Sequence, residues 1–231
     1  MTASAEDRLT DLARGWGEAG DRRAIFADCY LVMTGRVHEA IAAEDFVDGD
    51  WVSRLLDRFA DYYFDAVVAH DSPDAPVRCP TVWTGAFDAC KDPRCHPLRA
   101  LLLGINAHIN HDLALALADL LEDWHELDER TRAVRHADHE HVNEIIQATT
   151  DEVQREVVAR YAPETAILDT VLGPVDEWVF GAVVESFRGQ VWIDAMTLVT
   201  VPADEREESV LRVGRRAEQV ASVLTFGRSS R

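Results

Sequence analysis

One short segment places the residue types of acid–base and metal chemistry in a strongly apolar setting. It reads Gly104-Ile-Asn-Ala-His-Ile-Asn-His-Asp and lies within the most hydrophobic stretch of the chain, residues 98–121. Residues three and four positions apart share a helix face, so His108, His111 and Asp112 should point in similar directions. Burying such groups without partners costs about 1–3 kcal/mol each. A cluster this dense therefore needs a structural or a functional reason.

Two interpretations of this segment are open. In the functional one, His108 and Asp112 are metal ligands or an acid–base pair, and Asn106 and Asn110 hydrogen-bond to a substrate or a bound water. In the structural one, the segment is a polar network that links buried helices, with its Asn and His side chains bonded to backbone carbonyls. The density of polar groups favours the functional interpretation.

Further candidates lie on neighbouring segments. Asp138 and Asn143 fall in a histidine-rich stretch and would complete the site, although Asp138 is equally well placed as a helix N-cap or first-turn acid. If the side chain of Asp61 turned inward, it would add a carboxylate to a metal site. Tyr63 would then line the wall of the pocket.

A later segment carries an acid, a guanidinium and an indole on one helix face, at Glu185, Arg188 and Trp192. The planar fork of Arg188 suits a substrate carboxylate or phosphate, which it would bind with two hydrogen bonds. The alternative is an ion pair with Glu185 on the helix surface. Trp192 would line the substrate pocket.

Two other patterns leave simpler interpretations open. The cysteines Cys79, Cys90 and Cys95 lie near one another in a proline-rich segment and are compatible with free thiols, a disulfide or a metal site. Residues 15–20 match the Gly-x-Gly-x-x-Gly string of dinucleotide sites, but no strand precedes them. We expect a helix end and a turn there.

Helical periodicity dominates the sequence, and no alternating β-branched run is long enough to indicate a sheet. The helices expected from periodicity span residues 5–16, 25–44, 50–69, 82–90, 98–121, 137–161, 175–200 and 203–225. A polar linker is expected at 126–135, and a break at Gly173-Pro174. The sequence thus predicts one all-α domain over residues 1–231, a bundle of seven or eight helices around one very apolar central helix.

Composition limits the classes of partner. The chain has 231 residues, and 42 acidic against 23 basic side chains give it a formal net charge of −19. Nucleic acids and anionic membranes both attract clustered cations, so we expect neither as a partner. The sequence shows no transmembrane run and no secretory signal, which predicts a soluble cytoplasmic protein. It makes no prediction of oligomeric state.

The segment 102–113 resembles an uncharacterised, largely actinobacterial family, the domain of unknown function 5995, which is marked by a Gly-x-Asn-Ala-His-Ile-Asn-x-Asp-Leu helix. The similarity extends to residues 59–64 upstream and to Asp138 and residues 142–146 downstream, and it covers about residues 25–200. The resemblance implies a site made of Asn106, His108, Asn110 and Asp112, with Asp138 and Asn143 as companions. His111 stands where family members often carry another residue.

A weaker similarity exists to the helical zinc phospholipase C and P1 nuclease group, in which an inward helix carries a His-x-x-x-Asp pair like His108 and Asp112. The chain departs from that group in two places. Met1 stands where the group has a metal-binding Trp, and Leu113-Ala-Leu-Ala-Leu follows the Asp in place of a Pro-x-His ending.

We therefore expect a bacterial enzyme that acts on a small, partly apolar molecule in a buried pocket. Its chemistry would be metal-assisted hydrolysis or related acid–base catalysis centred on His108 and Asp112. A divalent metal, zinc, iron or manganese, would be held by His108, Asp112 and Asp61. The alternatives are a metal-free cyclase or isomerase of specialised metabolism, and a non-catalytic ligand-binding protein whose Asn/His/Asp segment is a structural network.

Overall fold

The computed structural model describes residues 4–72, 74–163 and 175–225, the last range with side chains from residue 184 onward. The described part is helical and contains no strand. Its helices are α1 (Ala5–Ala19), α2 (Ala24–Ala42), α3 (Gly49–Asp71), α4 (Thr81–Lys91), α5 (Pro97–Ala107), η1 (His108–Leu113), α6 (Ala114–Leu120), α7 (Glu129–Val153), η2 (Gln154–Val158), α8 (Ala159–Tyr161), α10 (Val175–Thr200) and α11 (Ala203–Thr225). The predicted break at Gly173-Pro174 lies outside the described residues.

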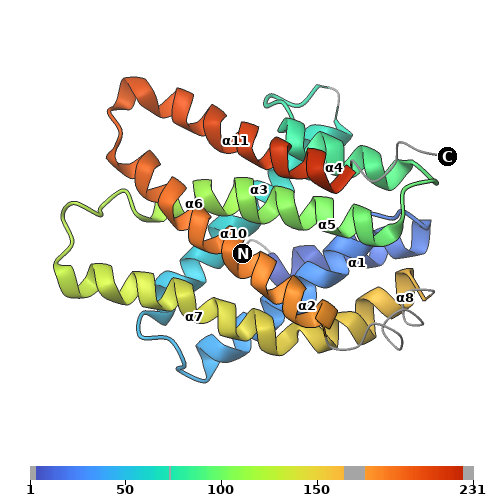
Figure 1. Ribbon diagram of the computed structural model, residues 1–231, viewed down its shortest axis with the longest axis horizontal. Helices are drawn as coiled ribbons and strands as arrows, with labels where there is room; N and C mark the ends of the chain where they lie inside the picture. The colour runs from blue at the N-terminus through green and yellow to red at the C-terminus, as the bar shows by residue number, and fades with distance from the viewer. Residues whose placement is uncertain (1–3, 73, 164–174, 226–231) are drawn as a thin grey trace.

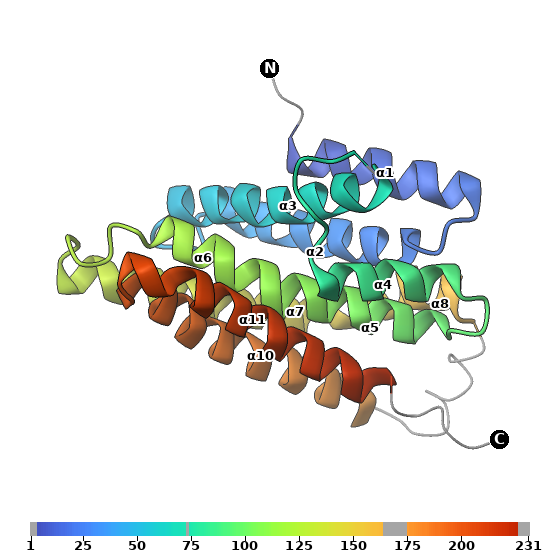
Figure 2. The same ribbon diagram turned by 90° about the horizontal axis from the view of Figure 1, so that it is seen from above.

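A single continuous rod of three segments, α5, η1 and α6, runs through the middle of the bundle (Figure 1). Helices α2 and α3 contact it on one side, and α10 and α11 contact it on the other, as the view from above shows (Figure 2). Helix α7 packs against α2 and α10. The predicted all-α bundle around one very apolar helix is confirmed.

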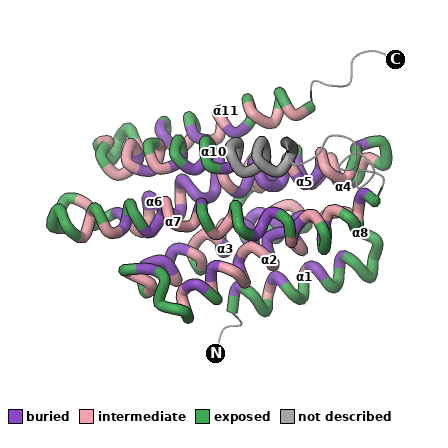
Figure 3. Tube along the Cα trace, turned by 60° about the horizontal axis from the view of Figure 1, so that its bottom comes forward, coloured by how far each residue is buried: buried purple, intermediate pink, exposed green. Residues whose placement is uncertain are grey.

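The central rod is buried on most of its faces (Figure 3). Spanning Pro97–Leu120, it is the one helix among the described residues that is long and apolar enough to cross a membrane by length and composition. Most of its apolar window is buried inside the bundle, as in the core helix of a globular protein. Its start is defined by Pro97 in the first turn and by the His96 side chain, which accepts a hydrogen bond from the Leu98 amide.

Close contact between the rod and α2 depends on a glycine. A Cβ atom at Gly104 would lie 2.8 Å from Cδ2 and 2.9 Å from Cγ of Phe26, distances that a real Cβ does not adopt. Phe26 in turn packs edge-on against His108, with ring centroids 5.6 Å apart. Gly104 thereby brings α2 against the segment that carries the candidate site.

The Asn/His/Asp segment forms a π-helical turn, η1, between two α-helical stretches. Such turns are rare and occur frequently at functional sites. Two histidines of this turn lie within hydrogen-bond distance of one carboxylate: His108, four residues before Asp112, and His111, the residue directly before it.

One predicted boundary is wrong. Helix α7 begins at Glu129, not at residue 137, because Asp128 is its N-cap and accepts a hydrogen bond from the Thr131 amide at 2.7 Å. The polar stretch from Glu129 to Arg135 is therefore the first part of a helix and not a linker. Asp138 lies well inside α7, so it is neither an N-cap nor a first-turn acid of its own helix.

The glycine-rich string near the N-terminus is a helix end, as predicted. Helix α1 stops at Ala19, and Gly20 adopts the left-handed conformation with φ 67°. Its amide donates back to the carbonyls of Gly17 and Trp16. No strand precedes these glycines in the described residues, so the requirements of a dinucleotide site are not met.

Candidate functional site

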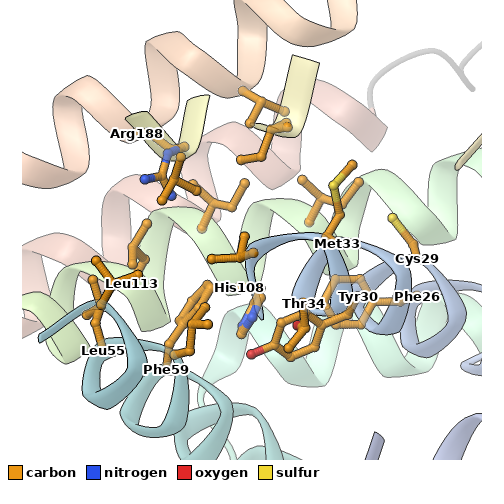
Figure 4. A pocket seen from close by; sticks show the side chains of 18 residues that line it. Phe26, Cys29, Tyr30, Met33, Thr34, Leu55, Phe59, His108, Leu113 and Arg188 are labelled. Atoms are coloured by element: carbon orange, nitrogen blue, oxygen red, sulfur yellow. The ribbon is translucent and has the colours of Figure 1, made fainter. Parts of the chain in front are cut away.

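A partly open cavity of about 120 Å³ lies where α2, α3, the central rod, α7 and α10 meet (Figure 4). Its wall is predominantly apolar. Four side chains with nitrogen or oxygen atoms interrupt it: Tyr30, Thr34, His108 and Arg188. The cavity is similar in size to an engineered apolar cavity of about 150 Å³ that takes up benzene.

His108 lies in the wall of this cavity with one nitrogen bonded and one free. Its Nδ1 is 3.1 Å from Oδ2 of Asp112, while Nε2 is buried and has no hydrogen-bond partner among the described residues. The imidazole stacks on the Phe59 ring with centroids 3.6 Å apart and planes inclined by 10°. The ring of Tyr30 approaches its other side, with centroids 4.3 Å apart. These contacts fix the plane of the imidazole.

Asp112 is the polar centre of the site. Its side chain is 1% exposed and accepts hydrogen bonds from three groups: His108 Nδ1, His111 Nδ1 at 2.8 Å and Trp83 Nε1 at 2.9 Å. Burial alone would raise the pKa of this carboxyl, but the bonds from the two histidines outweigh burial and lower the pKa below its ordinary value. Asp112 is therefore ionised at neutral pH.

The protonation state of His108 follows from the same geometry. Burial lowers the pKa of His108 below its ordinary value, although Asp112 opposes this shift. At neutral pH the imidazole is uncharged, and its Nδ1–H donates to the anionic carboxylate. Nε2 then carries a lone pair that no described group uses.

Two hydroxyl groups lie near this imidazole. The hydroxyls of Tyr30 and Thr34, one helical turn apart on α2, are buried and make no hydrogen bond of ordinary geometry. Burial and the nearby Asp112 raise the pKa of Tyr30, an effect that Thr34 partly offsets, so the phenol remains protonated. Both hydroxyls belong to side chains that line the cavity. Tyr30 and Thr34 were not among the residues that the sequence singled out.

Arg188 borders the same cavity from α10. Its Nε donates to Asn143 Oδ1 at 2.6 Å, and its Nη2 donates to the His139 carbonyl at 2.7 Å. Burial lowers the pKa of the guanidinium to about 10, which keeps it charged at neutral pH. Arg188 does not pair with Glu185, the alternative left open by the sequence; Glu185 accepts instead from Gln147 at 3.3 Å.

The two candidate asparagines on the rod serve packing. Asn110 donates to Asn106 Oδ1 at 2.9 Å, and Asn106 donates to the Ala217 carbonyl of α11 at 2.9 Å. Neither lines the cavity. This part of the segment matches the structural interpretation, a polar network that links buried helices.

Asp138 holds the loop before α3 and does not line the cavity. Its two carboxylate oxygens accept hydrogen bonds from the amides of Val47, at 3.0 Å, and Asp48, at 2.7 Å, directly before α3. Asn143 lies on the same helix but belongs to the cavity through Arg188. The two predicted companions thus have different roles.

Tyr63 and Trp192 lie beside the cavity, not in its lining. Tyr63 is fully buried in an aromatic cluster, with its ring centroid 5.2 Å from Phe26 and 5.1 Å from Trp83. Trp192 packs against His139, whose carbonyl holds Arg188, with centroids 5.1 Å apart. Both support residues of the site without reaching the space itself.

Asp61, the third expected metal ligand, lies at the surface. Asp61 is 48% exposed and forms an ion pair with Arg8 at 3.0 Å. The oxygens of Asp112 are already occupied by three donors, and nowhere in the described part do three or more His, Cys, Asp or Glu side chains form a metal-binding group. His108, Asp112 and Asp61 as arranged do not fit a metal site. The four cysteines are free thiols.

Comparison with known proteins identifies the family to which this chain belongs. Residues 3–226 match the family described as "Family of unknown function (DUF5995)". No curated protein and no solved structure matches the chain. The similarity to the zinc phospholipase C and P1 nuclease group stays a prediction, because no match bears on it. Since the matched range includes the η1 segment and nearly the whole bundle, the chain belongs to the DUF5995 family.

Proposed function

We propose that this protein is an enzyme that binds a small, mainly apolar molecule in its cavity, where His108 transfers a proton to or from that molecule. One observation carries the proposal: His108 lines the cavity, and its Nε2 atom is buried with no partner among the described residues, while Nδ1 is bonded to Asp112. A buried polar atom without a partner costs about 1–3 kcal/mol. A bound substrate would supply the missing partner.

The surrounding residues match the needs of a general base. Asp112 holds the imidazole in the tautomer that leaves Nε2 free, and its negative charge stabilises the imidazolium that forms when Nε2 takes a proton. Trp83 and His111 hold Asp112 in place. The Tyr30 hydroxyl supplies a neutral donor for charge that develops on the substrate.

Metal-free acid–base chemistry fits these contacts better than metal-assisted hydrolysis does. A metal site would need ligands besides His108 Nε2, and the described wall of the cavity contains no second His and no Asp or Glu. An isomerase or cyclase needs only a positioned base, a donor and an apolar cavity. We therefore propose this class of reaction.

A non-catalytic ligand-binding protein is the second candidate. The observation that favours it is the completeness of the network around the cavity: Asp112 and the Asn106–Asn110 pair all have partners. Such a network is sufficient to hold a rigid cavity open. In that case, the molecule in the cavity would leave unchanged.

An experiment in heavy water distinguishes the two candidate functions. The purified chain is incubated in D2O with a library of small apolar ketones, esters and carboxylic acids, and mass spectrometry detects conversion or deuterium uptake at carbon. We expect at least one compound to react, and the His108→Gln variant to be slower by about 10²–10⁴-fold, the usual contribution of a general base.

The matched control is His125→Gln, which replaces an exposed histidine. It should react at the wild-type rate. If compounds bind to the wild type but neither react nor exchange, the protein is a ligand carrier and the catalytic proposal is wrong. Reaction at an undiminished rate in His108→Gln would remove His108 from the mechanism.

A further inference from the structure

A buried positive charge borders the apolar cavity with no carboxylate bonded to it in the part of the chain that the structure describes. Arg188 is 5% exposed, and among the described residues it forms no ion pair. Other inward arginines of this acidic protein do have acidic partners. Arg135, which is 7% exposed, lies 2.7 Å from Asp123. Arg188 is therefore the exception that calls for an explanation.

The hydrogen bonds of Arg188 leave one end of the guanidinium open. Nε is bonded to Asn143 and Nη2 to the His139 carbonyl, both neutral acceptors. Nη1 has no partner among the described residues, and Arg188 lines the cavity wall (Figure 4). Asn143 and the His139 carbonyl fix the plane of the guanidinium from the protein side. The remaining donors are left for a bound molecule.

The nearest acid does not neutralise this charge directly. Glu140 accepts a hydrogen bond from Asn143 Nδ2 at 3.2 Å, so the asparagine amide lies between the carboxylate and Arg188. The Glu140 side chain is also 44% exposed, and water screens its charge. An uncompensated buried charge costs several kcal/mol, which a ligand of opposite charge would recover.

We infer that Arg188 is the anion-binding residue of this cavity and that the ligand is a monocarboxylate with a small apolar body. One guanidinium balances one negative charge. A phosphate carries close to two, and the second would stay uncompensated in an apolar space at high cost. A planar carboxylate also matches the flat edge of the guanidinium. The apolar wall then contacts the rest of the molecule.

The inference concerns the same cavity as the proposed function and rests on that cavity being a ligand site. It does not depend on chemistry at His108. It deepens the proposal by naming the substrate class: a small carboxylic acid bound through its carboxylate at Arg188, with its apolar body reaching along the wall that also contains His108.

Isothermal titration calorimetry on the full chain at pH 7.5 tests the inference. The probes are benzoate and hexanoate, each matched with the uncharged alcohol of the same skeleton, benzyl alcohol and hexanol. We expect each carboxylate to bind one molecule per chain, at least tenfold more tightly than its alcohol. We expect Arg188→Met to weaken carboxylate binding at least tenfold and to leave alcohol binding unchanged.

Arg135→Met is the matched control, because it also removes a buried guanidinium but lies outside the cavity lining. It should bind carboxylates as the wild type does. Arg188→Lys keeps the charge and should retain part of the preference. If Arg188→Met fails to fold, the ratio of carboxylate to alcohol affinity in the wild type still decides the question.

Three results would overturn the inference: no binding of any of the four probes to the wild type, alcohols that bind as tightly as carboxylates, or an undiminished carboxylate affinity in Arg188→Met. The outcome is separable from that of the proposed function. Binding without any reaction would refute the proposed chemistry alone, and reaction of uncharged compounds alone would refute only the carboxylate assignment.

Discussion

At the scale of single residues, the site is organised by one carboxylate. Asp112 accepts from two histidines and a tryptophan in a space where it is almost fully buried. Such a group is favourable only while all of its donors are in place, because an unmatched charge or donor in the interior loses its hydration without compensation. The orientation of His108 and the stability of the core therefore depend on the same atoms.

Replacing Asp112 by Asn should destabilise the fold strongly. The amide turns an NH2 group toward one of the three donors and removes the charge that they stabilise. We expect a loss of about 3–5 kcal/mol in the free energy of unfolding, as for other broken buried pairs. Urea denaturation followed by circular dichroism measures it.

Asp61→Asn is the matched control, since that carboxylate is half exposed and pairs only with Arg8. Exposed pairs contribute about 0–1 kcal/mol. Equal losses in the two variants would contradict the role assigned to Asp112.

At the scale of helices, the approach of α2 to the central rod positions the cavity. α2 supplies Tyr30 and Thr34, the rod supplies His108, and Phe26 fills the space between the two helices. Gly104 permits this approach because any side chain there would overlap the Phe26 ring near its base. The π-turn then directs His108 and His111 to the same carboxylate.

Gly104→Ala should therefore destabilise the protein, against the usual gain from replacing a helical glycine. The added methyl group must displace Phe26, and overpacking of this kind costs about 1–3 kcal/mol. The control is Gly35→Ala on α2, where nothing lies within 4 Å of the new Cβ. That variant should be more stable than the wild type by about 0.5–1 kcal/mol. Thermal denaturation of both variants gives the sign, and a stabilised Gly104→Ala would show that α2 is free to move.

At the scale of the whole molecule, the protein combines an acidic surface with polar groups in its interior. Its net charge is −19, and its arginines connect distant helices, as Arg36 on α2 does with Glu152 on α7. The interior contains histidines that stay uncharged. Burial lowers the pKa of His108, and burial together with the Arg188 charge lowers the pKa of His139 far more. Global stability should therefore depend on pH.

The free energy of unfolding should fall as the pH is lowered from 7.5 to 5.5. In this window the unfolded chain protonates both histidines more readily than the folded chain does, because folding lowers the pKa of each, so the unfolded state binds more protons. Each histidine contributes a slope of up to about 1.4 kcal/mol per pH unit. The lowered pKa of Asp112 adds a further loss once the pH falls below the ordinary range of Asp, about 3.9.

Urea denaturation at several pH values measures the slope, and the variants His108→Gln and His139→Gln test its origin. Glutamine does not titrate, so each variant should show a flatter dependence than the wild type. Slopes that match the wild type in both variants would place the titrating groups elsewhere.

The sequence by itself determined most of the helices and identified the polar segment that forms η1. Periodicity predicted most helix ranges, because each helix buries an apolar stripe that the 3.6-residue repeat reveals. The polar residues of η1 stood out because groups of that kind are costly in so apolar a helix. The sequence also identified Arg188 as an anion-binding candidate from the chemistry of its side chain alone. One boundary failed, since Asp128 and not Asp138 caps α7.

Only the tertiary structure decided which of the predicted residues act together. His108, Asp112 and Arg188 belong to the cavity region, whereas Asp61 pairs with Arg8 at the surface and Asp138 holds the amides before α3. Periodicity gives the face of a helix that is buried, but not the helix that covers it. The cavity is formed by α2, α3, the central rod, α7 and α10, and an atom without a partner among the described residues, such as Nε2 of His108, is known only once the neighbouring helices are placed.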